Sequence, residues 1–215
     1  MKFLAPFVFL VGIASAQPAA EFVPKPGVFP PAEAGHYYAG ELVSIDHVNR
    51  RGAIRLDGTG EEDRYQASPP HHFVLLSYAT VRYQGATADL VHIPLTTHLH
   101  GTFVLPPEGE TFIPVPKKEY AKWVPIHNHV ILLEDDVSFY TRRGQAWKID
   151  KFEVDKYSLI ATLTGPDLPG GFKGTKNFSI DASTRIWKGN GFGAMTDIQP
   201  GQSVQLSFAW RPEWE

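Results

Sequence analysis

Apolar and polar positions alternate in short runs along most of the chain. Segments such as ELVSIDHV, FVLLSYATVRY and HLHGTFVL are rich in β-branched and aromatic residues and are bounded by glycine, proline or charged turns. Helical periodicity is weak, and only residues 117–123 and the stretch LLEDDVSFYTRRG, which begins at Leu132, favour a short helix. The pattern therefore predicts an all-β protein with short helical turns.

One pattern of residues occurs twice. Residues 80–107 align with residues 184–212, so that Phe103 falls on Phe208, and the offsets between matched positions lie between 104 and 106 residues. A nearly constant offset is what an internal duplication produces. Each copy contains about five short strands and one helical turn, which is the content of a small OB-like barrel. The sequence therefore predicts two tandem OB-like β-barrels.

The first residues have the layout of a secretory signal peptide. Lys2 precedes an apolar run over residues 3–13, and small residues stand at Ala14 and Ala16. The run is shorter than the ~20 residues that a membrane-spanning helix needs, and no later segment is longer. We expect cleavage near Ala16, a periplasmic or secreted protein, and no transmembrane segment.

These observations divide the chain into five parts. Residues 17–35 are rich in proline and small residues, which is typical of an extended leader. The predicted parts are a signal peptide (1–16), a flexible leader (17–35), a first OB-like barrel (36–107), a linker with a short helix (108–144) and a second OB-like barrel (145–215).

The second copy, TRIWKGNGFGAMTDIQPGQSVQLSF, resembles the repeating unit of exported bacterial domains of unknown function that have an OB-like β-barrel. The shared motif is T-x-I, a glycine, and DI-x-x-G-x-x-V. The first copy departs from it, with His92 in place of the aspartate and Thr96 in place of the glycine. The whole chain is similar to uncharacterised exported proteins with duplicated domains of this type. The resemblance implies a fold and a location outside the cytoplasm, and no activity.

The amino-acid composition argues against several classes of function. The chain has no cysteine, which excludes disulfides, thiolate nucleophiles and metal sites that need sulfur. Its formal net charge is −3, whereas nucleic-acid-binding proteins usually present a basic face to the phosphates. We therefore expect no nucleic-acid partner.

Paired histidines are the strongest candidates for chemistry. In HLHG, Leu99 is expected to face the core with Phe103, so His98 and His100 should share the opposite, exposed face. Their Cβ atoms would lie about 7 Å apart, close enough to share a zinc or copper ion. His127 and His129 form a second pair of the same spacing. The predicted metal ligands are therefore His98, His100, His127 and His129.

Two interpretations of the histidines stay open. A pair of imidazoles needs a further ligand, for which the chain offers His127, His129, His92, Glu134, Asp135 and Asp136. An exposed strand face accepts histidine as readily as threonine, which gives His98 and His100 no special role. Asp135 or Asp136 can instead cap a short helix. His71 and His72 follow two prolines at the start of a strand, where a loop role is expected.

Other candidate sites are less complete. The acidic runs GTGEEDRY and LLEDDVSF offer paired carboxylates for a hydrolase, and residues 165–178 form a glycine-rich loop suited to binding. Several aromatics in irregular segments could stack on sugars: Tyr120, Trp123, Tyr140 and Trp214. Others fall in predicted strands and are expected in the core: Trp147, Trp187 and Trp210.

No complete catalytic constellation is found, so we do not expect an enzyme. The sequence favours an exported, non-catalytic protein that binds an extracytoplasmic ligand or protein, or acts as a scaffold. A copper- or zinc-binding protein is the alternative, and a carbohydrate-binding module or hydrolase is the second alternative. Apart from such a metal ion, no cofactor is expected.

Overall fold

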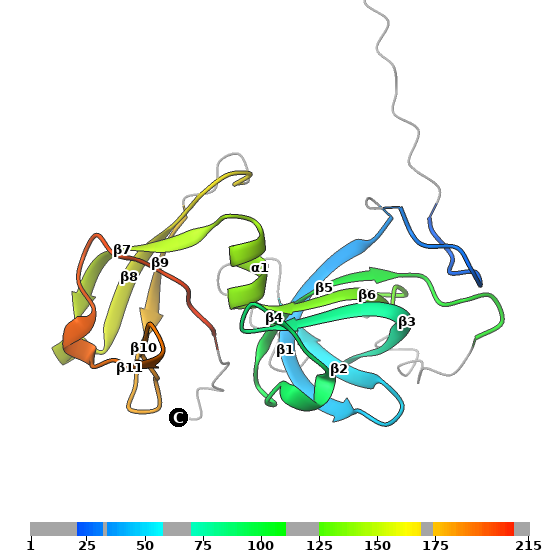
Figure 1. Ribbon diagram of the computed structural model, residues 1–215, viewed down its shortest axis with the longest axis horizontal. Coiled ribbons are helices and arrows are strands. Elements are labelled where there is room, and N and C mark those ends of the chain that lie inside the picture. Colours follow the sequence, from blue (N-terminus) through cyan, green and yellow to red (C-terminus); the bar gives the residue numbers. More distant parts are fainter. Residues whose placement is uncertain (1–20, 32–33, 58–69, 111–124, 169–173, 209–215) are drawn as a thin grey trace, which may run out of the picture.

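A computed structural model describes residues 21–31, 34–57, 70–110, 125–168 and 174–208. The fold is mostly β, as predicted, and consists of a closed barrel and a second, smaller β unit with the helix α1 (Asp136–Arg142) between them (Figure 1). Within the described ranges, no helix has the length and apolar character needed to cross a membrane. The predicted signal peptide lies outside the described residues.

The closed barrel has five strands. Their order around the barrel is β2-β1-β5-β6-β3, with β3 pairing back to β2. Neighbours are antiparallel except β3 and β6, which run parallel. A two-residue strand, β4 (Ala86–Thr87), forms a hairpin with the end of β3. The barrel strands are β1 (His36–Asp46), β2 (Arg51–Leu56), β3 (His71–Tyr83), β5 (His98–Val104) and β6 (His129–Asp135).

Apolar residues from all five strands fill the barrel. Leu99 and Phe103 are fully buried, so their predicted core positions are confirmed. Gly101 lies between them, and a Cβ atom at this position would stand 2.2 Å from the Phe103 ring. The glycine is therefore needed for that ring to lie flat across the strand. The other buried members of the core are Leu42, Ile54, Phe73, Leu75, Val81, Leu90, Ile93, Val130 and Leu133.

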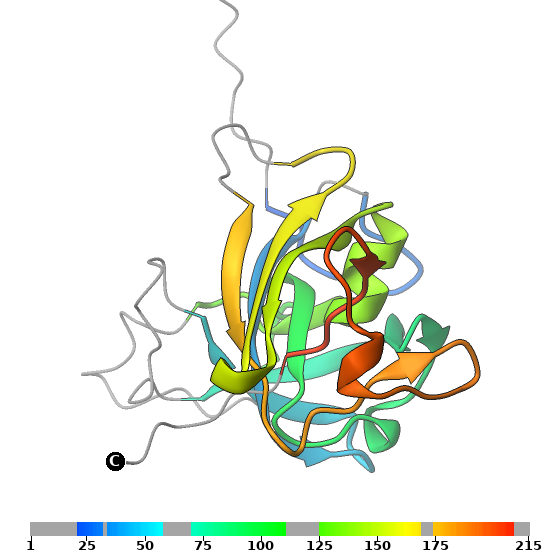
Figure 2. The ribbon, with the colours of Figure 1, turned by 90° about the vertical axis from the view of Figure 1, so that its left-hand side faces the viewer.

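The second unit contains a separate two-stranded hairpin and a four-stranded antiparallel sheet, which Figure 2 shows from its outer side. Its strand order is β12-β7-β8-β9, and it packs on Trp147, Ile149, Leu159 and Leu163. A second closed barrel, which the sequence predicts, is not found in the described part of the chain, where β12 and β9 are the two edges. The strands are β7 (Ala146–Glu153), β8 (Ser158–Thr164), β9 (Thr175–Ser179), β10 (Trp187–Lys188), β11 (Gly191–Phe192) and β12 (Ser203–Val204).

Backbone hydrogen bonds of the barrel recur in the second unit 105 residues later. Ala88 N–H donates to Val81 O in the barrel, and Gly193 N–H donates to Ile186 O in the second unit. The hairpins β3–β4 and β10–β11 keep the same spacing, and the neighbours in β12-β7-β8-β9 follow those in β5-β1-β2-β3. Each hairpin leads into a 3₁₀ helix: η1 (Leu90–His92) and η3 (Met195–Asp197). A third 3₁₀ helix, η2 (Val154–Lys156), joins β7 to β8.

The segment predicted as a linker, residues 108–144, contains part of the barrel. Strand β6 lies in this segment and pairs with both β3 and β5, so the barrel extends beyond residue 107. Hydropathy alone could not reveal this, because β6 pairs with strands that are distant in sequence. The short helix expected in this region is α1, and Asp135 caps it by accepting a hydrogen bond from Ser138 N–H at 3.1 Å.

Candidate functional site

The candidate site lies on the outer face of β5, under α1. The prediction that His98 and His100 face solvent is wrong, because both side chains are buried on the side opposite Leu99. The ring of Phe139 in α1 stacks on His100 with centroids 3.8 Å apart, and the ring of Phe208 lies beside His98. Both faces of β5 are therefore covered. Strand alternation shows which residues share a face, and it does not show whether a helix will cover that face.

Asp136 is the centre of the site. Its Oδ1 accepts hydrogen bonds from His98 Nδ1 at 2.7 Å and from His100 Nε2 at 2.9 Å. Its Oδ2 accepts the backbone N–H of Phe208 at 2.8 Å. Because Asp136 is the first residue of α1 and follows β6 directly, its carboxylate is held between the barrel and the end of the second unit.

Each imidazole also binds a partner through its other nitrogen. His98 Nε2 lies 2.8 Å from Asp57 Oδ2, and His100 Nδ1 lies 2.6 Å from the Tyr37 hydroxyl. The result is a continuous chain of hydrogen bonds that runs from Asp57 to Tyr37 through His98, Asp136 and His100. Each of the four imidazole nitrogens has a partner.

The hydrogen bonds also define the charges. Burial by itself lowers the pKa of His98, but hydrogen bonds and charge interactions with Asp136 and Asp57 outweigh burial and raise that pKa to about 10. His98 is thus an imidazolium between two carboxylates. Burial lowers the pKa of His100, and its hydrogen bond to Asp136 opposes this only in part. His100 is neutral, donating through Nε2 and accepting the Tyr37 hydroxyl proton at Nδ1.

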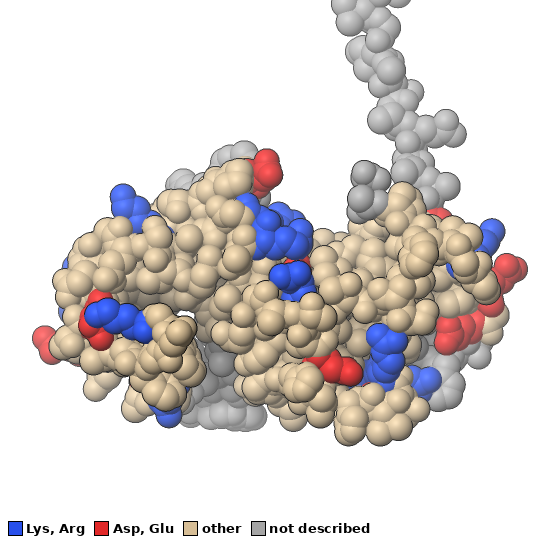
Figure 3. Space-filling view, in the orientation of Figure 1, with Lys and Arg blue, Asp and Glu red and all other residues tan. Residues whose placement is uncertain are grey.

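The aspartate and the phenol keep their ordinary charges. Burial would raise the pKa of Asp136, but the hydrogen bonds from His100 and His98 lower it below its usual range. The pKa of Tyr37 is raised, first by burial and then by the nearby Tyr140 and Asp57. Tyr37 therefore remains a neutral hydroxyl at physiological pH. The end of α1 contributes the basic residues Arg142 and Arg143, and basic side chains gather where the two units meet (Figure 3).

Three atoms of the site could hold one metal ion. His98 Nδ1 and His100 Nε2 lie 2.7 and 2.9 Å from Asp136 Oδ1, and one ligand atom of each of the three residues lies within 4.8 Å of the other two. Around a tetrahedral zinc with bonds of about 2.0 Å, ligand atoms lie about 3.3 Å apart, so small shifts would make room for the ion. Asp57 and Tyr37 would then orient the rings from behind, as outer partners do in metal sites.

The second predicted pair does not join this site. Along β5, His98 lies six residues from Val104, the residue that pairs with His129, which corresponds to roughly 20 Å of strand. His129 Nε2 lies 3.1 Å from Glu110 Oε2. His127 lies in another group, with His36 and Glu21. The four predicted ligands thus lie in three places: His98 and His100 together, His127 in a second and His129 in a third.

The geometry of the His127 group is less suited to a metal. The rings of His36 and His127 stack with centroids 3.6 Å apart and planes 20° apart. Parallel rings direct their lone pairs side by side, whereas ligands of one ion must converge on it. Glu21 lies 3.4 Å from His127 Nε2 and 3.9 Å from His36 Nε2. A shared ion would require one ring to turn.

Among the additional ligand candidates, only Asp136 reaches the site on β5. His92 accepts Asp89 N–H at the start of η1. Glu134 binds Arg142 through three short contacts, the shortest 2.6 Å, which occupies both its oxygens. Asp135 caps α1. Since the remaining acidic run, residues 61–63, lies outside the described residues, its role in a hydrolase remains a prediction.

Sequence reasoning missed Asp57 and Tyr37. Asp57 is separated by 41 residues from His98, and Tyr37 by 63 from His100, so no local motif connects them. Tyr37 lies in β1, which pairs with β5, and Asp57 follows β2, which pairs with β1; these pairings leave no signal in the sequence. Comparison with known proteins gives no further guidance, because no family model, curated protein or solved structure matches the chain.

Proposed function

We propose that this chain is an exported, non-catalytic binding protein built from two OB-like units, and that it binds a zinc or copper ion through His98, His100 and Asp136. The signal-peptide pattern of residues 1–16 supports export. The closed five-stranded barrel and the hydrogen bonds that recur 105 residues later support a duplicated unit. The grouping of two imidazoles and one carboxylate supports the proposal of a metal ion.

The arrangement of both ring nitrogens is the observation that carries the metal proposal. In each imidazole, one nitrogen faces Asp136 and the other is bound by an outer partner, Asp57 or Tyr37. Metal-binding histidines almost always have such a partner, which fixes the ring and its tautomer. In the metal-free protein, protons between the imidazoles and Asp136 occupy the position of the ion.

The donor set favours zinc or copper. Two imidazoles and one carboxylate, with no thiolate in the chain, suit these ions better than calcium or magnesium, which prefer oxygen ligands alone. Three protein ligands leave at least one coordination position for water or for a ligand of a partner.

The test is metal binding by the mature chain after treatment with a chelator and dialysis. We expect titration calorimetry and elemental analysis to give one zinc or copper ion per chain, and the variant His98→Ala/His100→Ala to retain none. A control variant, His47→Ala/His72→Ala, removes two exposed histidines and should bind as the wild type does. No retained ion, or equal retention by both variants, would refute the metal proposal.

Export is tested separately. Mass spectrometry of the protein recovered from outside the cytoplasm should find a mature chain that begins at Gln17. A chain that keeps residues 1–16 and stays in the cytoplasm would contradict the proposed location without bearing on the metal.

A further inference from the structure

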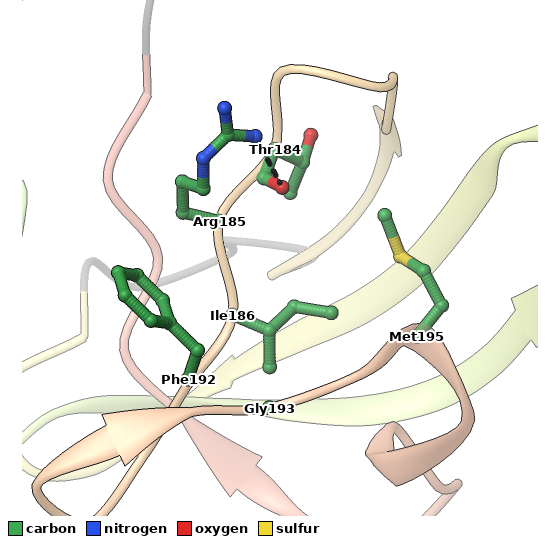
Figure 4. Close-up of a pocket in the computed structure, with 6 residues that line it drawn as sticks. All are labelled: Thr184, Arg185, Ile186, Phe192, Gly193 and Met195. Carbon is green, nitrogen blue, oxygen red and sulfur yellow. Dashed lines mark hydrogen bonds between the residues drawn. The ribbon is translucent and has the colours of Figure 1, made fainter.

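A cavity opens in the second unit beside the β10–β11 hairpin. Its volume is about 290 Å³. Three of its residues come from the segment before β10, two from β11 and its end, and one from η3 (Figure 4). The lining residues are Thr184, Arg185, Ile186, Phe192, Gly193 and Met195.

The corresponding position in the barrel is filled by β6. By the recurrence of 105 residues, Ile186 corresponds to Val81 and Met195 to Leu90. Val81 and Leu90 are core residues with exposed fractions of 4% and 0%. Val81 pairs with Leu133 of β6, which is also fully buried. The cavity therefore lies where a strand equivalent to β6 would place its inward side chain.

Strand β6 lies between β5 and β3 in the barrel. The matching strands of the second unit are β12 and β9, and in the described part of the chain these are the outer strands of their sheet. Unpaired strand edges expose backbone donors and acceptors that a further strand can bind. By this correspondence, a strand equivalent to β6 would lie between the outer edges of β12 and β9 and would fill the cavity with one side chain.

We propose that the second unit binds an extended segment of a separate polypeptide, which adds as a strand between β12 and the β9–β10 segment. By analogy with β6, it runs parallel to the β9–β10 segment and antiparallel to β12. Strand addition of this kind obtains affinity from backbone hydrogen bonds and specificity from pockets for alternate side chains. This inference does not depend on the metal.

The cavity defines the chemistry of the partner. Ile186, Phe192 and Met195 give it apolar walls, which favour aliphatic side chains at alternate positions. Arg185 donates to three backbone carbonyls, and none of its contacts within the described ranges is to a carboxylate. Its charge therefore favours an acidic residue in the partner, as Glu134 of β6 binds Arg142.

Two exposed aromatic rings flank the cavity and extend the apolar surface. Trp187 and Phe192 are 64% and 73% exposed, and their centroids are 4.5 Å apart. The expectation that Trp187 belongs to the core is therefore wrong, whereas Trp147 is buried as predicted. The equivalent barrel residues, Arg82 and Thr87, form the same hairpin, so the turn does not require aromatics. The pair is available to contact a partner strand.

The probe is a labelled peptide with the sequence of β6 and its neighbours, HNHVILLEDDV, added to the mature chain. We expect saturable binding by fluorescence anisotropy, and at least tenfold weaker binding by the variants Ile186→Asp and Phe192→Ser. Phe192→Ser changes an exposed residue and so keeps the proposal testable if Ile186→Asp does not fold. The control variant Val154→Ser alters another exposed apolar residue, which does not line the cavity, and should bind as the wild type does.

Three outcomes would overturn the proposal. The first is an absence of binding, or binding that is equal in the wild type and both cavity variants. The second is a dimer in light scattering that Phe192→Ser dissociates, since a second copy would then occupy the position. The third is peptide binding that requires removal of residues 209–215, since the chain itself would then be the occupant.

A β6 peptide with Leu133→Asp should bind at least tenfold more weakly than the unchanged peptide, because its inward side chain is charged.

Discussion

Replacing Asp136 by asparagine tests the central hydrogen-bond network. The change preserves shape, but it removes the negative charge and places an NH₂ group where an oxygen now accepts. If the amide oxygen faces His98 and His100, the NH₂ group opposes Phe208 N–H, and the reverse orientation opposes two imidazole donors. In either orientation at least one buried donor loses its acceptor, and the imidazolium of His98 loses its nearest carboxylate.

The expected cost is large because Asp136 is fully buried. Removing one partner of a buried ion pair costs about 3 to 5 kcal/mol. His98 limits the loss by releasing its proton, so we expect about 3 kcal/mol at pH 7. The pKa of His98 is raised to about 10 in the folded state, so the stabilisation is complete below about pH 6.5 and is lost as the pH rises through 10. The cost of the substitution should therefore be smaller above pH 10.

Urea denaturation in the presence of a chelator measures both effects. Tryptophan fluorescence, to which the buried Trp147 contributes, reports on unfolding. The control Asp150→Asn changes an exposed strand carboxylate and should alter the free energy of unfolding by less than about 0.5 kcal/mol. A loss below about 1 kcal/mol for Asp136→Asn, or an equal loss at pH 7 and above pH 10, would refute the assigned charges.

Three other residues give independent tests of the fold. Burial lowers the pKa of His71 to about 4, so the wild type should lose up to about 3 kcal/mol as the pH falls from 6.5 to 4, and His71→Gln should reduce this slope in acid denaturation. Asp135→Ala removes the cap of α1 and should lower the free energy of unfolding by about 1 to 2 kcal/mol, measured by thermal denaturation beside the wild type. Gly101→Ala should cost about 1 to 3 kcal/mol in urea, because the new Cβ atom overlaps the Phe103 ring, and an unchanged midpoint would contradict the packing described.

Local features of the sequence predicted several parts of the structure. Alternation identified Leu99 and Phe103 as core residues, because a strand places every second side chain on one face. The acidic pair at the start of the short helix predicted a cap at Asp135 or Asp136, and the structure shows Asp135 in that role, which depends only on residues within one turn. Each of these features depends on residues that are close together in the sequence.

Long-range contacts account for what could not be predicted. The burial of His98 and His100 depends on Phe139 of α1 and on Phe208, which come from distant segments. Asp57 follows the end of β2, which pairs with β1, and β1 pairs with β5. Only this order of strands in the closed barrel brings Asp57 to His98. A single sequence carries no record of such pairings, so the histidines were assigned to the correct strand and the wrong environment.

The position of Asp136 has a second consequence for the proposed metal site. Its Oδ1 faces the two imidazoles of the barrel, while its Oδ2 holds the Phe208 N–H of the second unit. His98 N–H also donates to Phe208 O at 3.2 Å, so backbone and side chain bind the same residue. An ion at Oδ1 would leave the bond at Oδ2 in place. Metal binding and the contact between the units are therefore separable: removing both imidazoles should abolish the first, and only loss of the carboxylate should weaken both.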